Sequence, residues 1–149
     1  MRMIVFVFVL AFLQLGTNVI AQVSDGNDYS RISLAALFDY TNDLNYSSQV
    51  LDEYVNKNIS ESEAIQSIMA VYLLAGRTES NIAKVEPPTK YSNFHNYTFN
   101  AVVNFRLYLW NLAKYMETRY PEYGVEAQTY LNQSLEYRQK AIDESVLIL

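Results

Sequence analysis

The sequence contains no cysteine and has only four glycines, three prolines and one histidine among its 149 residues. The lack of cysteine excludes disulfide bonds, cysteine-based zinc sites, thiol nucleophiles and the attachment of c-type haem. Few glycines and prolines argue against a β fold, which needs many turns, and favour long helices. Hydrophobic residues make up 50% of the chain, which is enough for a core in one domain without covalent crosslinks.

Positive charge is also scarce, since 11 Lys and Arg residues stand against 16 Asp and Glu residues. Removal of the first 21 residues takes away one positive charge, that of Arg2, and brings the net charge to about −6. No cluster of Lys or Arg follows that could neutralise phosphate groups. We therefore exclude nucleic acids and anionic membrane surfaces as principal partners.

Residues 1–21 have the pattern of a secretory signal peptide. A single positive charge precedes an apolar run of about eleven residues, and the small residues Val19 and Ala21 define a cleavage site before Gln22. We therefore expect a secreted or extracytoplasmic protein. The alternative is an uncleaved anchor formed by residues 3–21, although the apolar run is shorter than the ~20 residues of a spanning helix.

The remaining chain predicts an all-α fold. After a flexible leader at residues 22–28, apolar residues recur every three or four positions in four stretches. The four helices are predicted at residues 29–55, 60–85, 92–119 and 121–147. Ser60 and Glu63 form the sequence signature of a capping box, and Pro87-Pro88 ends the second helix.

Short connections between these helices favour an up-and-down four-helix bundle over residues 29–149, preceded by the signal segment. Phe105 is expected on the buried face of the third helix. The structural alternative is a pair of two-helix hairpins that dimerises.

No constellation of residues predicts catalysis or metal binding. His95 is the only histidine, and the residue three positions before it is Ser92 rather than the glutamate of a di-iron motif. Asp39 and Asp43 imitate the start of a calcium loop, but Leu44 takes the place of its glycine. Nucleophile elbows and phosphate-binding loops are absent from the sequence. We predict a protein that is not an enzyme and has no metal site or cofactor.

Tyrosine is the unusual residue, with thirteen copies. The rings either cap a bundle core with their hydroxyl groups in water or form an aromatic recognition surface. The fourth helix carries a tyrosine stripe beside an aliphatic stripe of Leu131, Leu135, Ile142 and Val146. Trp110 lies at the edge of its own stripe and is either a core-edge ring or a partner anchor. The candidate binding residues are Tyr91, His95, Trp110, Tyr123, Tyr130 and Tyr137.

Four Asn-x-Ser/Thr acceptors for N-glycosylation are present, at Asn45, Asn58, Asn96 and Asn132. Asn58 lies in a predicted loop and is the best candidate. The other three lie in predicted helices, where acceptors are used less readily.

The stretch from Pro87-Pro88 through Tyr91 to His95 leads into a helix rich in Tyr and Phe. It resembles exported helical proteins of unknown function from archaea and bacteria, in outline over residues 29–147 and in motif over residues 87–112. The resemblance implies a helical bundle outside the cytoplasm and carries no known substrate.

These observations predict an exported, non-catalytic helical domain that binds a protein or an envelope component, or has a structural role at the cell surface. The alternative function is a bundle that holds a small ligand or a metal between its helices, near His95 and the linker between the second and third helices. Native mass spectrometry of residues 22–149 would distinguish them by the presence or absence of a bound ligand.

Overall fold

The computed structural model describes residues 26–148, all of which lie in helices or short connections, with no β-strand among them. The elements are α2 (Gly26–Val55), α3 (Glu61–Ala83), the 3₁₀ helix η1 (Thr89–Tyr91), α4 (Ser92–Thr118) and α5 (Pro121–Ile148). The prediction of an all-helical chain is confirmed, and four long helices are consistent with a four-helix bundle.

The beginning of α2 differs from the sequence prediction. Residues 26–28 were assigned to a flexible leader at 22–28, but the backbone is already helical from Gly26. The correction is small because apolar periodicity alone locates helix ends poorly. The signal segment at residues 1–21, and the alternative anchor at 3–21, lie outside the described residues.

Helix α3 begins with the predicted capping box. Ser60 has an extended backbone, and its hydroxyl accepts a hydrogen bond from the Glu63 N–H at 3.3 Å, while the Glu63 carboxylate accepts from the Ser60 N–H at 2.9 Å. Glu61 and Glu63 also place negative charge at the positive end of the helix dipole. The sequence signature is thus confirmed atom by atom.

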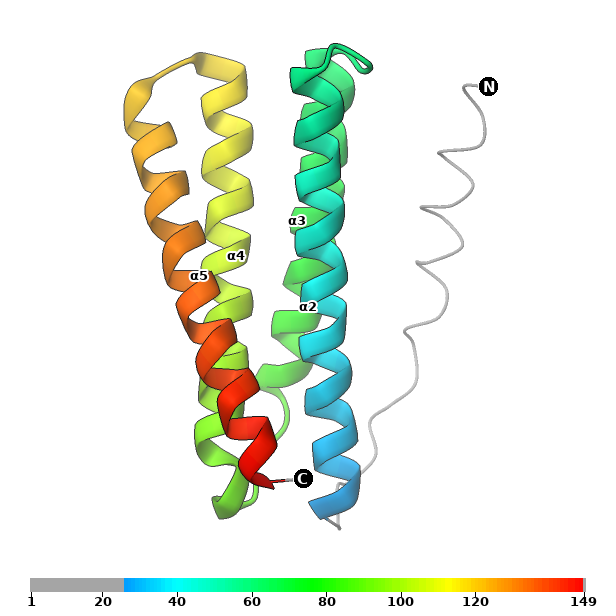
Figure 1. Cartoon of the computed structure of the whole chain (residues 1–149), viewed down its shortest axis with the longest axis vertical. Coiled ribbons are helices and arrows are strands. Elements are labelled where there is room, and N and C mark those ends of the chain that lie inside the picture. Colours follow the sequence, from blue (N-terminus) through cyan, green and yellow to red (C-terminus); the bar gives the residue numbers. More distant parts are fainter. Residues whose placement is uncertain (1–25, 149) are drawn as a thin grey trace.

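Successive helices run in opposite directions, with α2 and α3 forming one pair and α4 and α5 the other (Figure 1). Contact is most extensive between α4 and α5, followed by α3 with α4 and α2 with α3. Helices α2 and α5 have the least contact of the neighbouring pairs. Helix α4 is therefore the element around which the others are arranged.

The centre of the core is aromatic. Phe105 of α4 is fully buried, as predicted, and Tyr40 of α2 meets it edge to face with ring centroids 5.3 Å apart. All residues of the described core lie between Tyr29 and Ala141, so a chain that begins at Gln22 retains the whole of it.

One buried hydrogen-bonded chain joins three helices. Ser134 of α5 donates its only hydroxyl hydrogen to the Ala101 carbonyl of α4 at 2.8 Å. The 2.8 Å contact between Tyr40 and Ser134 must therefore have the Tyr40 hydroxyl as donor. This chain is a polar connection between α2 and α5, which otherwise touch little.

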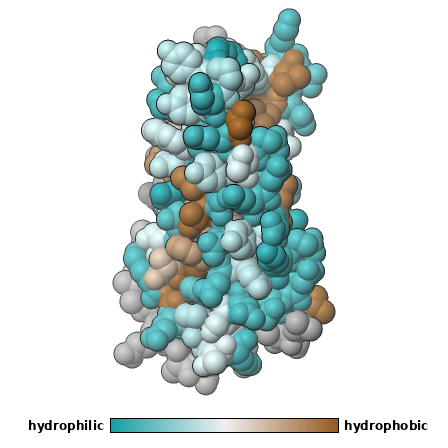
Figure 2. Space-filling model, turned by 90° about the vertical axis from the view of Figure 1, so that its left-hand side faces the viewer, coloured by the Kyte–Doolittle hydropathy of each residue, from teal (hydrophilic) through white to brown (hydrophobic). Residues whose placement is uncertain are grey.

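On the side of the molecule formed by α4 and α5, hydrophobic side chains occur in small separate groups among hydrophilic ones (Figure 2). Within the described part of the chain, no helix has the length and hydrophobicity that crossing a membrane requires.

Candidate functional site

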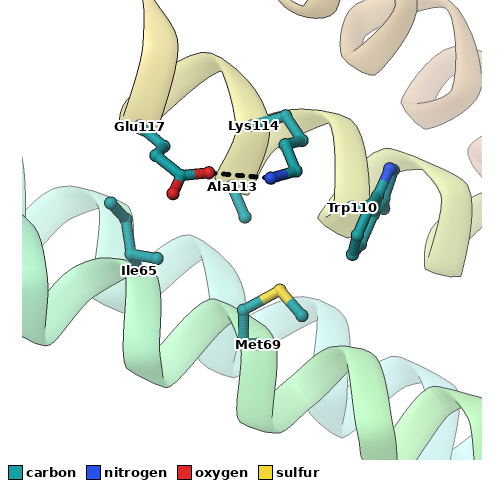
Figure 3. Close-up of a pocket in the computed structure, with 6 residues that line it drawn as sticks. All are labelled: Ile65, Met69, Trp110, Ala113, Lys114 and Glu117. Atoms are coloured by element: carbon teal, nitrogen blue, oxygen red, sulfur yellow. Dashed lines mark hydrogen bonds and ion pairs between the residues drawn. The ribbon is translucent and has the colours of Figure 1, made fainter.

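A shallow hollow of about 220 Å³ lies on the surface where α3 and α4 meet (Figure 3). Ile65 and Met69, one turn apart on α3, form one wall, and Trp110 and Ala113 of α4 form the other. The charged side chains at its rim are Lys114 and Glu117 of α4. The hollow thus has an apolar interior, an aromatic wall and a charged edge.

Trp110 is the aromatic residue in the lining of this hollow, with 41% of its surface exposed. Its ring lies 5.8 Å from that of Tyr72 on α3, and the Lys114 ammonium lies 5.3 Å from the ring centroid. Lys114 also donates a hydrogen bond to Glu117 at 2.8 Å, which raises the pKa of Lys114. Trp110, Lys114 and Glu117 are three or four positions apart on α4, so their side chains lie on one face of that helix.

Apolar and aromatic surface continues along α3 from the hollow. Leu73 follows Met69 by one turn and is 66% exposed. Beside it, the Arg106 guanidinium lies over the Tyr72 ring at 5.4 Å and forms an ion pair with Glu79 at 3.2 Å. The seam between α3 and α4 therefore offers both apolar contact area and fixed charges.

A second hollow, of about 400 Å³, adjoins the first and shares Ile65 and Glu117 with it. Its other lining residues are Glu61, Ser62 and Gln66 of α3. Two carboxylates, a hydroxyl group and an amide thus face this space, and no cation is among the described residues that line it.

A cluster at the same end of the bundle joins three helix ends. Glu61 forms an ion pair with Arg119 and accepts a hydrogen bond from the Tyr54 hydroxyl at 2.9 Å. Arg119 also donates to the Tyr54 oxygen at 2.9 Å. Arg119 has a left-handed backbone with φ of 60° and ends α4 by donating its N–H to the Tyr115 carbonyl. Nothing in the sequence pattern indicated this cluster, because its members are far apart along the chain.

The residues predicted around the linker have structural partners. Tyr91 is only 3% exposed, and its ring lies 5.2 Å from that of the fully buried Tyr29. The Tyr29 hydroxyl lies 2.8 Å from His95 Nδ1, and burial lowers the pKa of His95. The direction of this bond follows from which ring nitrogen of His95 carries the hydrogen. His95 therefore connects the start of α4 to α2, and Tyr91 contributes packing rather than accessible surface.

The tyrosines of α5 are half-buried. Tyr130 and Tyr137 pack against the core, and the Tyr137 ring lies 6.5 Å from that of Tyr97 on α4. Lys140 lies over Tyr137 at 5.3 Å. Tyr123 is half-buried near the start of α5. These positions favour the interpretation in which the tyrosine rings cap the core. Each ring keeps an accessible edge, and contact of these edges with a partner stays a prediction.

The acidic residues that imitate a calcium loop lie within α2 instead. Burial raises the pKa of Asp43 to about 7, and the nearby charge of Asp39 adds to this effect. Burial also raises the pKa of Asp39, and the positive charge of Arg77 on α3 partly offsets this effect. Among residues 26–148, no three His, Asp or Glu side chains come together in a way that could hold a metal ion.

All four glycosylation acceptors are exposed, and they differ in backbone context. Asn58 lies in the turn between α2 and α3, whereas Asn45, Asn96 and Asn132 lie within helices. This agrees with the predicted placement, and glycosylation itself stays a prediction.

We compared the chain with known protein families, with curated protein sequences and with solved structures, and no match was found in any of the three. The resemblance to exported helical proteins of archaea and bacteria therefore stays a prediction.

Proposed function

We propose that this chain is an exported, non-catalytic four-helix bundle that binds a protein through the hollow between α3 and α4. The proposal combines an up-and-down bundle with a signal segment at residues 1–21 that directs it out of the cytoplasm. The observation that supports it is the exposed ring of Trp110, which stands beside an apolar hollow.

A tryptophan in this setting is suited to recognition. Tryptophan is enriched among the residues that contribute most to protein interfaces, because its ring buries a large area when a partner covers it. Ile65 and Met69 supply apolar contacts beside it, and the flexible Met69 side chain adapts to different shapes. The volume of about 220 Å³ fits one large side chain of a partner rather than a cofactor.

The alternative, a small-ligand or metal bundle near His95, has less support. His95 already contacts the Tyr29 ring and is hydrogen-bonded to its hydroxyl group, and Tyr29 in turn packs against Tyr91. Neither of the two hollows described above is lined by His95 or by Tyr91.

The test uses the only tryptophan of the chain as its own reporter. The chain from Gln22 onward is incubated with fractions of the native envelope while Trp110 emission is recorded. A shift that is absent in a Trp110→Phe variant supplemented with a distant tryptophan would support binding at the hollow. The Trp110→Ala variant has no tryptophan to record, so its binding is measured by retention of the same fractions on immobilised protein, and retention equal to that of the wild-type chain would refute the proposed site.

A matched control is Tyr120→Ala. Tyr120 is also an exposed aromatic residue, and it lies in the connection between α4 and α5 rather than in the hollow. Its removal is expected to leave binding unchanged, so that the effect of Trp110→Ala can be assigned to position rather than to loss of any surface ring.

A further inference from the structure

The two adjoining hollows differ in chemistry, and this difference defines what a ligand must carry. The first is lined by Ile65, Met69, Ala113 and the Trp110 ring, with charges only at its rim. The second shares Ile65 and Glu117 with the first and adds the Glu61 carboxylate, Ser62 and Gln66, so it is the more polar and acidic of the two. A ligand that fills both must therefore present an apolar group to one and hydrogen-bond donors, preferably cationic ones, to the other.

The acidic side chains of the second hollow remain accessible. The side chains of Glu61 and Glu117 are 42% and 59% exposed, although each already contacts a cation, Arg119 and Lys114 respectively. Exposed ion pairs of this kind are weak, because water and salt screen the attraction between the two charges. A cation brought by a ligand can therefore share or replace these contacts.

The distance between the two hollows is set by α3. Glu61, Ile65 and Met69 occupy successive turns of that helix, and each turn rises about 5.4 Å. Glu61 in the acidic hollow is thus one turn from Ile65, which both hollows share, and two turns from Met69 in the apolar hollow. In a helical ligand, side chains three or four positions apart have Cβ atoms about 5–6 Å apart.

We propose that the hollows recognise a helical segment of a partner protein in which a large apolar side chain lies one turn from a lysine or arginine. This inference rests on the proposed function, because it assumes that Trp110 marks a protein-binding site. The two adjoining hollows lie at the seam between α3 and α4, and a helix is a ligand whose side chains can fill neighbouring hollows one turn apart. The net negative charge of the chain, −5, also favours encounter with a cationic segment.

The experiment is a selection from a random peptide library displayed on phage, with the chain from Gln22 onward as the target. Peptides that also bind a Trp110→Ala variant are removed. The enriched sequences are expected to share a Leu, Ile, Met or Phe residue with Lys or Arg three or four positions away. Should Trp110→Ala lose its helical circular dichroism, Met69→Gln at the opposite wall takes its place.

A double-mutant cycle then tests the cation directly by titration of Trp110 emission. Glu117→Gln is expected to weaken the selected peptide about two- to fivefold, and a Gln substitution of the peptide cation is expected to do the same. The two changes together should cost no more than either alone, and the loss should shrink at high salt. Glu136→Gln on α5 is the matched control, because Glu136 is likewise exposed and paired with a lysine, Lys140.

Each result has a defined meaning. Trp110-dependent peptides without a preference for cations would overturn this inference and leave the proposed binding function in place. A library that yields no Trp110-dependent peptide would overturn both. Concentration-dependent self-association that Trp110→Ala abolishes would identify a second copy of the chain as the occupant and would also overturn the inference.

Discussion

The buried hydrogen-bonded chain from Tyr40 through Ser134 to the Ala101 carbonyl gives a quantitative prediction about stability. Both side chains are almost inaccessible, with exposed fractions of 1% for Tyr40 and 0% for Ser134. Ser134→Ala leaves the Tyr40 hydroxyl buried without its acceptor, at a cost of about 1–3 kcal/mol. Tyr40→Phe should cost only about 0.5–1.5 kcal/mol, because Ser134 keeps its bond to Ala101.

The double variant tests whether the cost of Ser134→Ala comes from the unpartnered Tyr40 hydroxyl or only from lost contacts. Once Ser134 is alanine, Tyr40→Phe removes a hydroxyl that no longer has a partner, and should be neutral or stabilising. The cost of the double variant should therefore be clearly less than the sum of the two single costs.

Urea unfolding of the chain from Gln22, followed by far-ultraviolet circular dichroism, measures all four proteins. A loss of 1 kcal/mol corresponds to a fall of roughly 3–6 °C in Tm for a domain of this size, so a thermal melt is a second measure. Strictly additive costs, or a greater cost for Tyr40→Phe than for Ser134→Ala, would refute the assigned direction of the hydrogen bonds.

Four further predictions follow from the sequence and the structure. Phe105→Ala should leave a core cavity and cost about 3–5 kcal/mol, whereas Glu117→Ala should cost less than about 1 kcal/mol; equal unfolding midpoints would contradict the assigned faces of α4. Gly76→Ala should stabilise α3 by about 1 kcal/mol, because the added Cβ would lie no closer than 3.5 Å to its neighbours, and a lower Tm would show that the helix cannot accept it. Burial raises the pKa of Asp43 from 3.8 to about 7, so the folded state binds this proton more tightly than the unfolded chain and stability falls as the pH rises between those values. Asp43→Asn should therefore stabilise the protein at about pH 8 and change little at about pH 3.5, as measured by urea unfolding at each pH. Finally, N-terminal sequencing of exported protein should begin at Gln22, and recovery of the intact N-terminus from membranes would instead support the anchor.

Local sequence signals predicted the helices well. The Ser60 and Glu63 capping box is confirmed because every atom it needs lies within four residues. Pro121 begins α5, and Phe105 is fully buried. Such features depend on spacing along one helix, which the sequence displays directly.

Features that depend on two helices were not predictable in the same way. Tyr29 was read only as the start of a helix, yet it is a fully buried partner of His95. On α5, Leu135 and Val146 belong to the aliphatic stripe but are 39% and 73% exposed. The periodicity of α5 shows two adjoining stripes and cannot say which one a neighbour covers. That choice is made by the extensive contact of α5 with α4 and its slight contact with α2.

The candidate site includes one feature that the sequence could predict and one that it could not. The sequence predicts Trp110 at the edge of the apolar stripe of its helix, and its exposed fraction of 41% is consistent with this position. The hollow beside it could not be foreseen, because Ile65 and Met69 come from α3 and its shape depends on how closely the two helices approach.

The alternating directions of the helices decide how far the Trp110 surface would stand from a point of attachment at either end of the described chain. Helix α2 begins and α5 ends at the same end of the molecule, whereas the hollow lies toward the opposite end, near the turns that follow α2 and α4 (Figure 1). Helix α2 has 30 residues and therefore spans about 45 Å. Trp110 lies 18 residues from the start of α4, so a tether at the start of α2 or a fusion at the end of α5 would hold the Trp110 surface roughly 27 Å along the bundle from that end.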